Sequence, residues 1–112
     1  VFTILNPGKN TLVISDKSKG VKIEDQNGNV INTDASGISI TSKKDIKLTA
    51  SGNLELKGTK GITLNSSSGD VKVDGKNVNL TGKAKVVVSG SSGTDIKSSG
   101  TVTIKGSMVS IN

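Results

Sequence analysis

The sequence predicts an all-β protein: a trimeric, intertwined triple-stranded β-helix (a β-prism) with eight-residue repeats, preceded by a short β neck. Three observations lead to this fold class. The aliphatic residues are almost all Val, Ile and Leu, which suit a pleated, half-buried surface. They recur in apolar–polar–apolar triplets about every eight residues. No window shows the 3.6-residue apolar period of an amphipathic helix, so essentially no helix is expected.

The composition is unusual for a compact globular domain. The chain has 112 residues, enough for one domain, with Phe2 as its one aromatic residue and with no Cys, His, Trp or Tyr. A shortage of aromatic residues is also typical of disordered chains. A disordered chain, however, has no reason to keep a regular apolar period, so we expect an ordered repeat protein.

The net charge is basic, at +6 from 15 Lys/Arg against 9 Asp/Glu. Such a balance can indicate nucleic acid or an anionic membrane surface as a partner. Here the lysines are spread over the whole chain, and no set of aromatic side chains is available for stacking bases. We therefore expect solvated outer faces and no nucleic-acid partner.

Residues 1–36 are expected to form the β neck. Longer strand candidates lie at wider spacing here than later in the chain, at residues 11–14, 21–24 and 30–32. Between the last two, Asn27-Gly28 is a strong signal for a two-residue hairpin turn. The neck is expected to gather the chains before the regular prism begins at Gly37.

Residues 37–112 carry ten triplets whose starts are separated by 8, 8, 8, 9, 7, 8, 8, 8 and 7 residues. In each triplet two side chains point to the interior and the middle one points to solvent. Gly and other turn-forming residues fill the gaps. The weaker triplet Thr94-Asp95-Ile96 contributes only Ile96 to the apolar interior. The predicted trimer core consists of Ile38, Ile40, Ile46, Leu48, Leu54, Leu56, Ile62, Leu64, Val71, Val73, Val78, Leu80, Val86, Val88, Ile96, Val102, Ile104, Val109 and Ile111.

The length of the repeat bears on the number of chains. Eight residues supply one strand and one corner, and three such faces, about 24 residues, are needed to close a tube. One chain could supply all three faces, or three chains could supply one face each. Successive eight-residue repeats, called octads from here on, share the same apolar pattern. A single-chain coil, in contrast, usually has a repeat of about 20 to 30 residues. This favours a homotrimer; a single-chain β-solenoid, acting as an adhesin or surface-binding module, is the alternative.

No arrangement for catalysis is visible in the sequence. Without His, the many serines lack the usual base that would make one of them a nucleophile. Glu24 and Asp25 are adjacent on a predicted strand and therefore face opposite sides. We expect no enzyme, no metal site and no cofactor. An ice-binding face would need a uniform row of outward threonines, and a lyase would need long loops, whereas these gaps are only about five residues long.

The neck and its junction with the octads resemble a known family. An apolar strand ending in Asp (Thr11 to Asp16), a strand followed by Asp-x-x-Gly-Asn (Val21 to Asn29), and the stretch Asp34 to Ile40 occur in that order. Together they are similar to the C-terminal β-helical spike region of the VgrG and phage T4-like cell-puncturing baseplate spike family. The similarity extends over nearly the whole chain, and the neck is its most specific part.

The resemblance implies a structural role and several partners. It implies the shaft and tip of a membrane-puncturing needle in a contractile injection machine, either a phage tail baseplate or type VI secretion. The needle would reside in the virion baseplate or be secreted into the target cell envelope. It would connect to tail tube or hub proteins through a domain preceding Val1, and a PAAR-repeat protein would cap its tip.

The expected tip lies at residues 108–112. Some short spikes of this family close their own tip with histidines around an iron ion, and this chain has no His with which to do so. If the fragment reaches the natural C-terminus, the trimer would end in an open apolar surface, for which the resemblance implies a PAAR-type cap. The predicted cap-docking residues are Met108, Val109, Ser110, Ile111 and Asn112.

Overall fold

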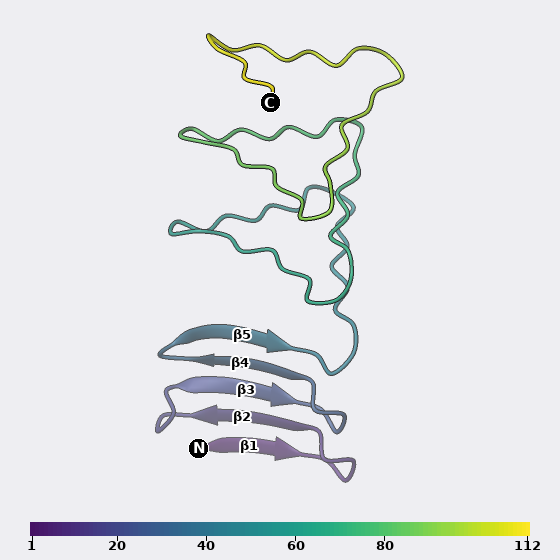
Figure 1. Cartoon of the computed structure of the whole chain (residues 1–112). Coiled ribbons are helices and arrows are strands. Elements are labelled where there is room, and N and C mark those ends of the chain that lie inside the picture. Colours follow the sequence, from purple (N-terminus) through teal and green to yellow (C-terminus); the bar gives the residue numbers. More distant parts are fainter. The chain divides into compact units, whose positions relative to one another are not determined.

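The computed structural model describes all 112 residues and contains five strands and no helix, which confirms an all-β fold. The strands are β1 (Phe2–Leu5), β2 (Thr11–Ser15), β3 (Gly20–Glu24), β4 (Val30–Asp34) and β5 (Gly37–Thr41). Each pairs antiparallel with the next, which produces a five-stranded meander in sequence order (Figure 1). No element is a helix long and apolar enough to cross a bilayer.

The strands of the neck lie where the sequence predicts them, with one addition. The candidates at 11–14, 21–24 and 30–32 correspond to β2, β3 and β4. The additional strand is β1, whose segment Phe-Thr-Ile-Leu alternates and is followed by a turn-forming Pro-Gly pair. β5 contains the earliest triplet of the repeat, Ile38–Ile40, so it belongs to the meander by pairing and to the repeat by spacing. We call the next triplet, Ile46–Leu48, the first octad, because it is the first one beyond the meander. The predicted neck boundary at residue 36 stays a prediction.

The register of the meander gathers its apolar residues on one face. Because cross-strand partners point to the same side and side chains alternate along each strand, two rows of five residues share this face. One row runs across the sheet as Phe2, Ile14, Val21, Thr33 and Ile38, and the other as Ile4, Leu12, Ile23, Ile31 and Ile40. We call these ten residues the neck apolar face.

The β3–β4 hairpin is confirmed, but its predicted two-residue turn is wrong. The Gly28 N–H donates to the Asp25 carbonyl (3.2 Å), and the Asp25 N–H donates to the Asn29 carbonyl (3.1 Å). Gly28 has a φ of 86°, whereas Asn27 does not have a positive φ. This is a three-residue loop, Gln26 to Gly28, in which glycine takes the left-handed position. The Asp25 side chain favours the longer loop, because its Oδ1 accepts the N–H groups of Asn27 and Asn29, both at 2.9 Å.

The β1–β2 loop repeats the same design without glycine at the left-handed position. The Lys9 N–H donates to the Asn6 carbonyl (3.0 Å), and the Asn6 N–H donates to the Asn10 carbonyl (3.2 Å). Lys9 takes the left-handed conformation, with φ at 64°. The two loops start 19 residues apart, at Asn6 and at Asp25. The neck is therefore built from two similar hairpins and a fifth strand.

After Thr41 the chain forms no strand and makes no backbone-to-backbone hydrogen bond. The chain divides into two compact units, residues 1–61 and 62–112. In the first unit, residues 42–61 continue from β5 without a ladder. In the second unit the backbone makes repeated, open changes of direction, drawn in teal to yellow in Figure 1. The octads therefore do not pair with one another within a single chain.

Candidate self-association surface

The neck apolar face has nothing covering it. Nine of its ten residues are apolar, and no hydrophobic residue of the chain is buried. Ile38 is 75% exposed and Phe2 is 58% exposed, values expected for a polar surface rather than for the inside of a sheet. An antiparallel sheet normally packs one face against a core. This sheet presents the face on which such a core would form.

Thr33 is the one polar residue on this face, and its hydroxyl group is already engaged. The Val21 N–H donates to Thr33 Oγ1 (3.2 Å), and Thr33 Oγ1 in turn donates to the Val21 carbonyl (3.3 Å). Burying a polar group is costly only when its hydrogen bonds are lost. The whole neck apolar face can therefore be covered by apolar partners without leaving this hydroxyl unsatisfied.

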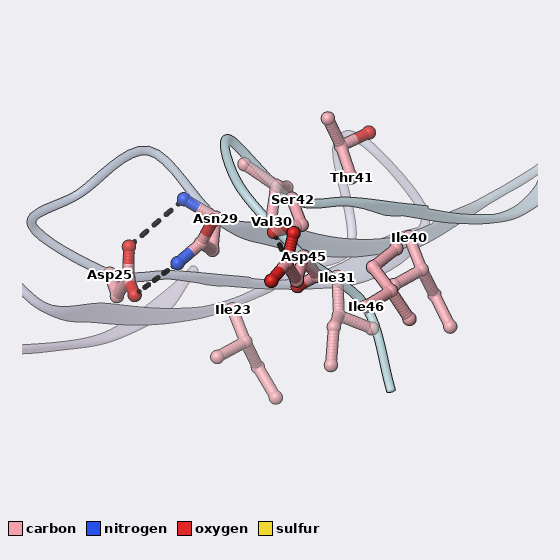
Figure 2. A pocket seen from close by; sticks show the side chains of 10 residues that line it. All are labelled: Ile23, Asp25, Asn29, Val30, Ile31, Ile40, Thr41, Ser42, Asp45 and Ile46. Atoms are coloured by element: carbon pink, nitrogen blue, oxygen red, sulfur yellow. Dashed lines mark hydrogen bonds between the residues drawn. The ribbon is translucent and has the colours of Figure 1, made fainter. Parts of the chain in front are cut away.

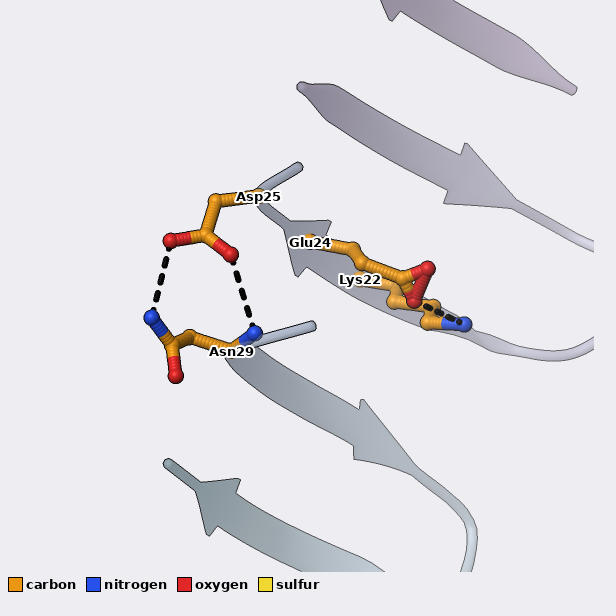
Figure 3. A network of polar contacts seen from close by, with 4 residues as sticks. All are labelled: Lys22, Glu24, Asp25 and Asn29. Carbon is orange, nitrogen blue, oxygen red and sulfur yellow. Dashed lines mark hydrogen bonds and ion pairs between the residues drawn. The ribbon is translucent and has the colours of Figure 1, made fainter. Parts of the chain in front are cut away.

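The opposite face of the meander is polar. Lys22 Nζ lies 3.2 Å from Glu24 Oε2, and both residues belong to the face of β3 opposite the neck apolar face (Figure 3). The cross-strand neighbours of Lys22 on this face are Val13 and Asn32, and Ser39 follows on β5. The sheet is thus amphipathic, with one face suited to water and one suited to burial.

Asp25 holds the β3–β4 loop together through its side-chain carboxylate. The Asn29 N–H donates to Oδ1 and the Asn29 side-chain amide to Oδ2, both at 2.9 Å (Figure 3). Hydrogen bonds from the backbone and side chain of Asn29, with smaller contributions from Asn27, lower the pKa of the Asp25 carboxyl from its ordinary value of 3.8. The carboxylate therefore serves as a fixed turn acceptor at neutral pH.

Two asparagines tie successive turns together at the same end of the sheet. The Gln26 N–H donates to Asn10 Oδ1 (2.9 Å), which joins the β1–β2 loop to the β3–β4 loop. The Lys43 N–H donates to Asn29 Oδ1 (2.8 Å), which joins the β3–β4 loop to the segment after β5. These bonds fix the direction in which the chain leaves the meander.

A hollow of about 380 Å³ lies where the meander meets the first octad. The side chains of Ile23, Ile31, Ile40 and Ile46 project to the same side of it, and Figure 2 shows this arrangement together with the polar rim. The residues that line it are Ile23, Asp25, Asn29, Val30, Ile31, Ile40, Thr41, Ser42, Asp45 and Ile46. Ile46 thus continues the neck apolar face beyond β5.

The nineteen residues of the predicted trimer core are all exposed in the single chain. Their exposed fractions run from 47% at Val102 to 87% at Ile111. Aliphatic side chains exposed at this level and at a regular period are expected to be covered in the working protein. The role of these residues as a trimer core stays a prediction.

The backbone of residues 42–112 also lacks partners in a strand ladder. It makes no backbone-to-backbone hydrogen bond, and its few local bonds use serine side chains, as when the Gly69 N–H donates to Ser66 Oγ (3.2 Å). When such backbone groups are buried in a folded protein, they are normally paired by hydrogen bonds. A single-chain solenoid would pair its own successive turns, and none pair here.

The predicted cap-docking residues lie at the C-terminal end of the second unit. Met108 is 86% exposed and Ile111 is 87% exposed, while Val109 is 50% exposed. Residues 108–112 form no strand. No group of three or more His, Cys, Asp or Glu side chains gathers here or elsewhere in the chain. Docking of a cap to these residues stays a prediction.

Sequence reasoning placed the self-association surface in the octads and missed the neck apolar face. The signal for it was present in the alternation of the neck strands, for example Leu12 and Ile14 on β2 and Val21 and Ile23 on β3. What the sequence did not show was the register, which brings all five strands onto one side. The asparagine ties were missed as well, although Asn10 and Asn29 close loops of equal length.

The comparisons with known proteins agree with this surface. Residues 2–56 match the family model of the phage baseplate V C-terminal trimerisation domain. This match covers the whole meander and the octads up to Leu56, and it confirms the resemblance to the C-terminal region of baseplate spikes. A search among curated proteins gave no match. Over residues 2–56 the chain is therefore similar to a structural trimerisation domain of the phage baseplate.

Proposed function

We propose that this chain forms the trimeric shaft and tip of a membrane-puncturing spike in a contractile injection machine, such as a phage tail or a type VI secretion system. Three copies bring their neck apolar faces together and then wind around one another as an intertwined β-helix. The protein performs no catalysis in this role. The matched baseplate domain is a structural one, which supports the proposal.

One observation carries the proposal. From residue 42 to residue 112 the chain has regularly spaced aliphatic side chains that are uncovered and a backbone that makes no ladder hydrogen bond. Neighbouring copies would cover the aliphatic side chains and would also supply the strands that pair with the backbone. The description of the matched domain as a trimerisation domain supports three copies.

The proposed mechanism is mechanical. Stacked strands are held by ladder hydrogen bonds along the shaft axis, and the interior is filled by aliphatic side chains that resist shear. Ten layers at about 4.8 Å each give a shaft on the order of 50 Å long. Charged and polar side chains cover the outside, so that the needle stays soluble until it is driven into the target envelope.

Electron cryomicroscopy of the isolated chain tests the shape. The proposal predicts a rod with threefold symmetry and a shaft of about 50 Å built from layers spaced by about 4.8 Å. A compact particle without threefold symmetry would contradict it.

Two partners are part of the proposal. Tube or hub proteins of the machine attach at the neck end of the trimer. A PAAR-repeat protein docks on residues 108–112, where Met108 and Ile111 are the most exposed apolar side chains. Covering an apolar trimer end by a conical partner removes both the exposed side chains and the open strand edges.

Titration of a purified PAAR-repeat protein onto the full chain tests the cap. Ile111→Asp should weaken binding at least tenfold, because it places a charge on the docking surface. Ser110→Ala is the matched control, since its side chain is predicted to point outward. Equal affinity of the two variants, with trimer mass retained in both, would exclude residues 108–112 as the docking site.

A further inference from the structure

The outer edge of β5 (Gly37–Thr41) has no strand beside it. β5 pairs with β4 through one edge only, because it is the last strand of the meander. Its triplet alternates in the usual way, with Ile38 and Ile40 on the neck apolar face and Ser39 on the polar face. An open strand edge of this kind is a template for another strand.

The chain itself does not use this edge. After Thr41 the backbone is held in a corner, because the Lys43 N–H donates to Asn29 Oδ1 (2.8 Å). Within the corner Ser42 Oγ donates to the Asp45 carbonyl (2.9 Å) and accepts the Lys44 N–H (3.1 Å). No backbone-to-backbone hydrogen bond joins β5 to any later residue. The corner therefore directs the first octad away and leaves the β5 edge open.

The apolar surface nevertheless continues around the corner. Ile40 of β5 and Ile46 of the first octad line the same hollow, and Figure 2 shows both side chains projecting to one side. The backbone of residues 46–48 has no ladder partner of its own. Ile46 thus lies on the same side as the neck apolar face, although the chain has turned a corner after β5.

These observations, together with the proposed trimer on which this inference rests, determine what can occupy the β5 edge. In a threefold assembly each copy places β5 on one face and its first octad on the next face. On that next face lies the open β5 edge of the neighbouring copy. We infer that the free edge of β5 pairs with residues Ile46–Leu48 of a neighbouring copy, and that this junction sets the axial register of the three chains.

The octads alone cannot set this register. A shift of one chain by one octad brings another triplet of the same pattern into place along most of the shaft, so most inward positions stay apolar. The meander is not built on this short repeat, and β5 is physically joined to it by the β4 pairing. The junction of β5 with the first octad is therefore the place where a shift of one octad would leave an edge unpaired.

Cysteine cross-linking in the full chain tests the junction, since the natural sequence has no cysteine. Ser39 and Lys47 are the outward-pointing middle residues of the two triplets, and adjacent layers place such positions about 4.8 Å apart. This spacing falls within the Cα separation of about 4.4–6.8 Å that a disulfide spans. The double variant Ser39→Cys with Lys47→Cys is expected to run as a covalent trimer on a non-reducing gel after mild oxidation.

The matched control shifts the second cysteine by one octad, to Ser39→Cys with Glu55→Cys. These positions are predicted to lie two layers, about 9.6 Å, apart and to remain uncross-linked. Cross-linking of this pair in place of the first would overturn the proposed register and leave the trimer standing. A trimeric mass with no cross-link in either pair would overturn the junction. A monomeric mass of the unmodified chain would overturn the proposed trimer itself, and the inference with it.

Discussion

At the scale of single residues, the neck depends on a few polar side chains that shape its loops. Asn10 and Asn29 each close a loop and also accept a hydrogen bond from the next turn, at 2.9 Å and 2.8 Å. Asp25 accepts two backbone N–H groups within its own loop. These side chains are polar and can remain in contact with water, so they position the chain without needing a buried core.

Asp25 makes the stability of the neck depend on pH. Its pKa is lower in the folded chain than the unfolded value of about 3.9, chiefly because of the backbone and side-chain hydrogen bonds from Asn29. A lowered folded pKa means that this contribution is fully present above the unfolded pKa and is lost as the pH falls through the folded pKa. An NMR titration of the Asp25 carboxyl should give a midpoint below the ordinary value.

The variant Asn29→Ala provides the control for this titration. It removes the side-chain amide bond to Asp25 Oδ2 but keeps the backbone bond to Oδ1, so the midpoint should rise part of the way toward the ordinary value. A midpoint at or above the ordinary value in the unmodified chain would contradict the role assigned to Asn29.

Gly20 is a second residue with a specific structural requirement. A Cβ atom at this position would clash with the carbonyl oxygen of Thr33 on the neighbouring strand β4. Gly20→Ala should therefore destabilise the folded protein by about 1–3 kcal/mol per chain, as measured by chemical denaturation. At Gly8 the nearest atom is the flexible Gln26 Oε1, at 2.7 Å, so Gly8→Ala should change stability by less than about 1 kcal/mol. Equal effects of the two substitutions would contradict this account.

At the scale of elements, the sequence allowed the strand positions to be predicted but not their pairing. The clusters of Val, Ile and Leu in residues 11–14, 21–24 and 30–32 were sufficient to place β2, β3 and β4, because these residue types favour strands. The form of the Asn27-Gly28 turn was not predictable from that dipeptide. The acceptors of Asp25, which lie outside the dipeptide, favour the three-residue loop.

The amphipathic sheet makes a prediction that separates its two faces. Ile31→Lys places a charge in the middle of the neck apolar face, where burial of an unpaired charge costs several kcal/mol. We expect this variant to lose self-association and to appear as a monomer in light scattering. Ser39→Lys on the opposite face should keep the mass of the unmodified chain. Loss of association in Ser39→Lys but not in Ile31→Lys would show that the wrong face has been assigned.

At the scale of the whole molecule, the octad period predicts an assembly of several chains, which the structure of a single chain does not contain. Equivalence of successive octads predicts that neighbours from other copies complete each face, and the single chain forms no ladder after Thr41. The inward positions, such as Leu54 and Leu56, stay a prediction from the spacing of the triplets. The neck apolar face was not predictable from the sequence, because it arises only when the register of all five strands is known.

The measurement that tests the central claim most directly is the solution mass of this chain, by native mass spectrometry or light scattering. The account predicts a mass three times that of the 11.4 kDa chain, persisting in mild denaturant because the interior and the ladders are shared between copies. A well-folded monomer of 11.4 kDa would contradict it, since the neck apolar face and the octads would then have to be stable uncovered.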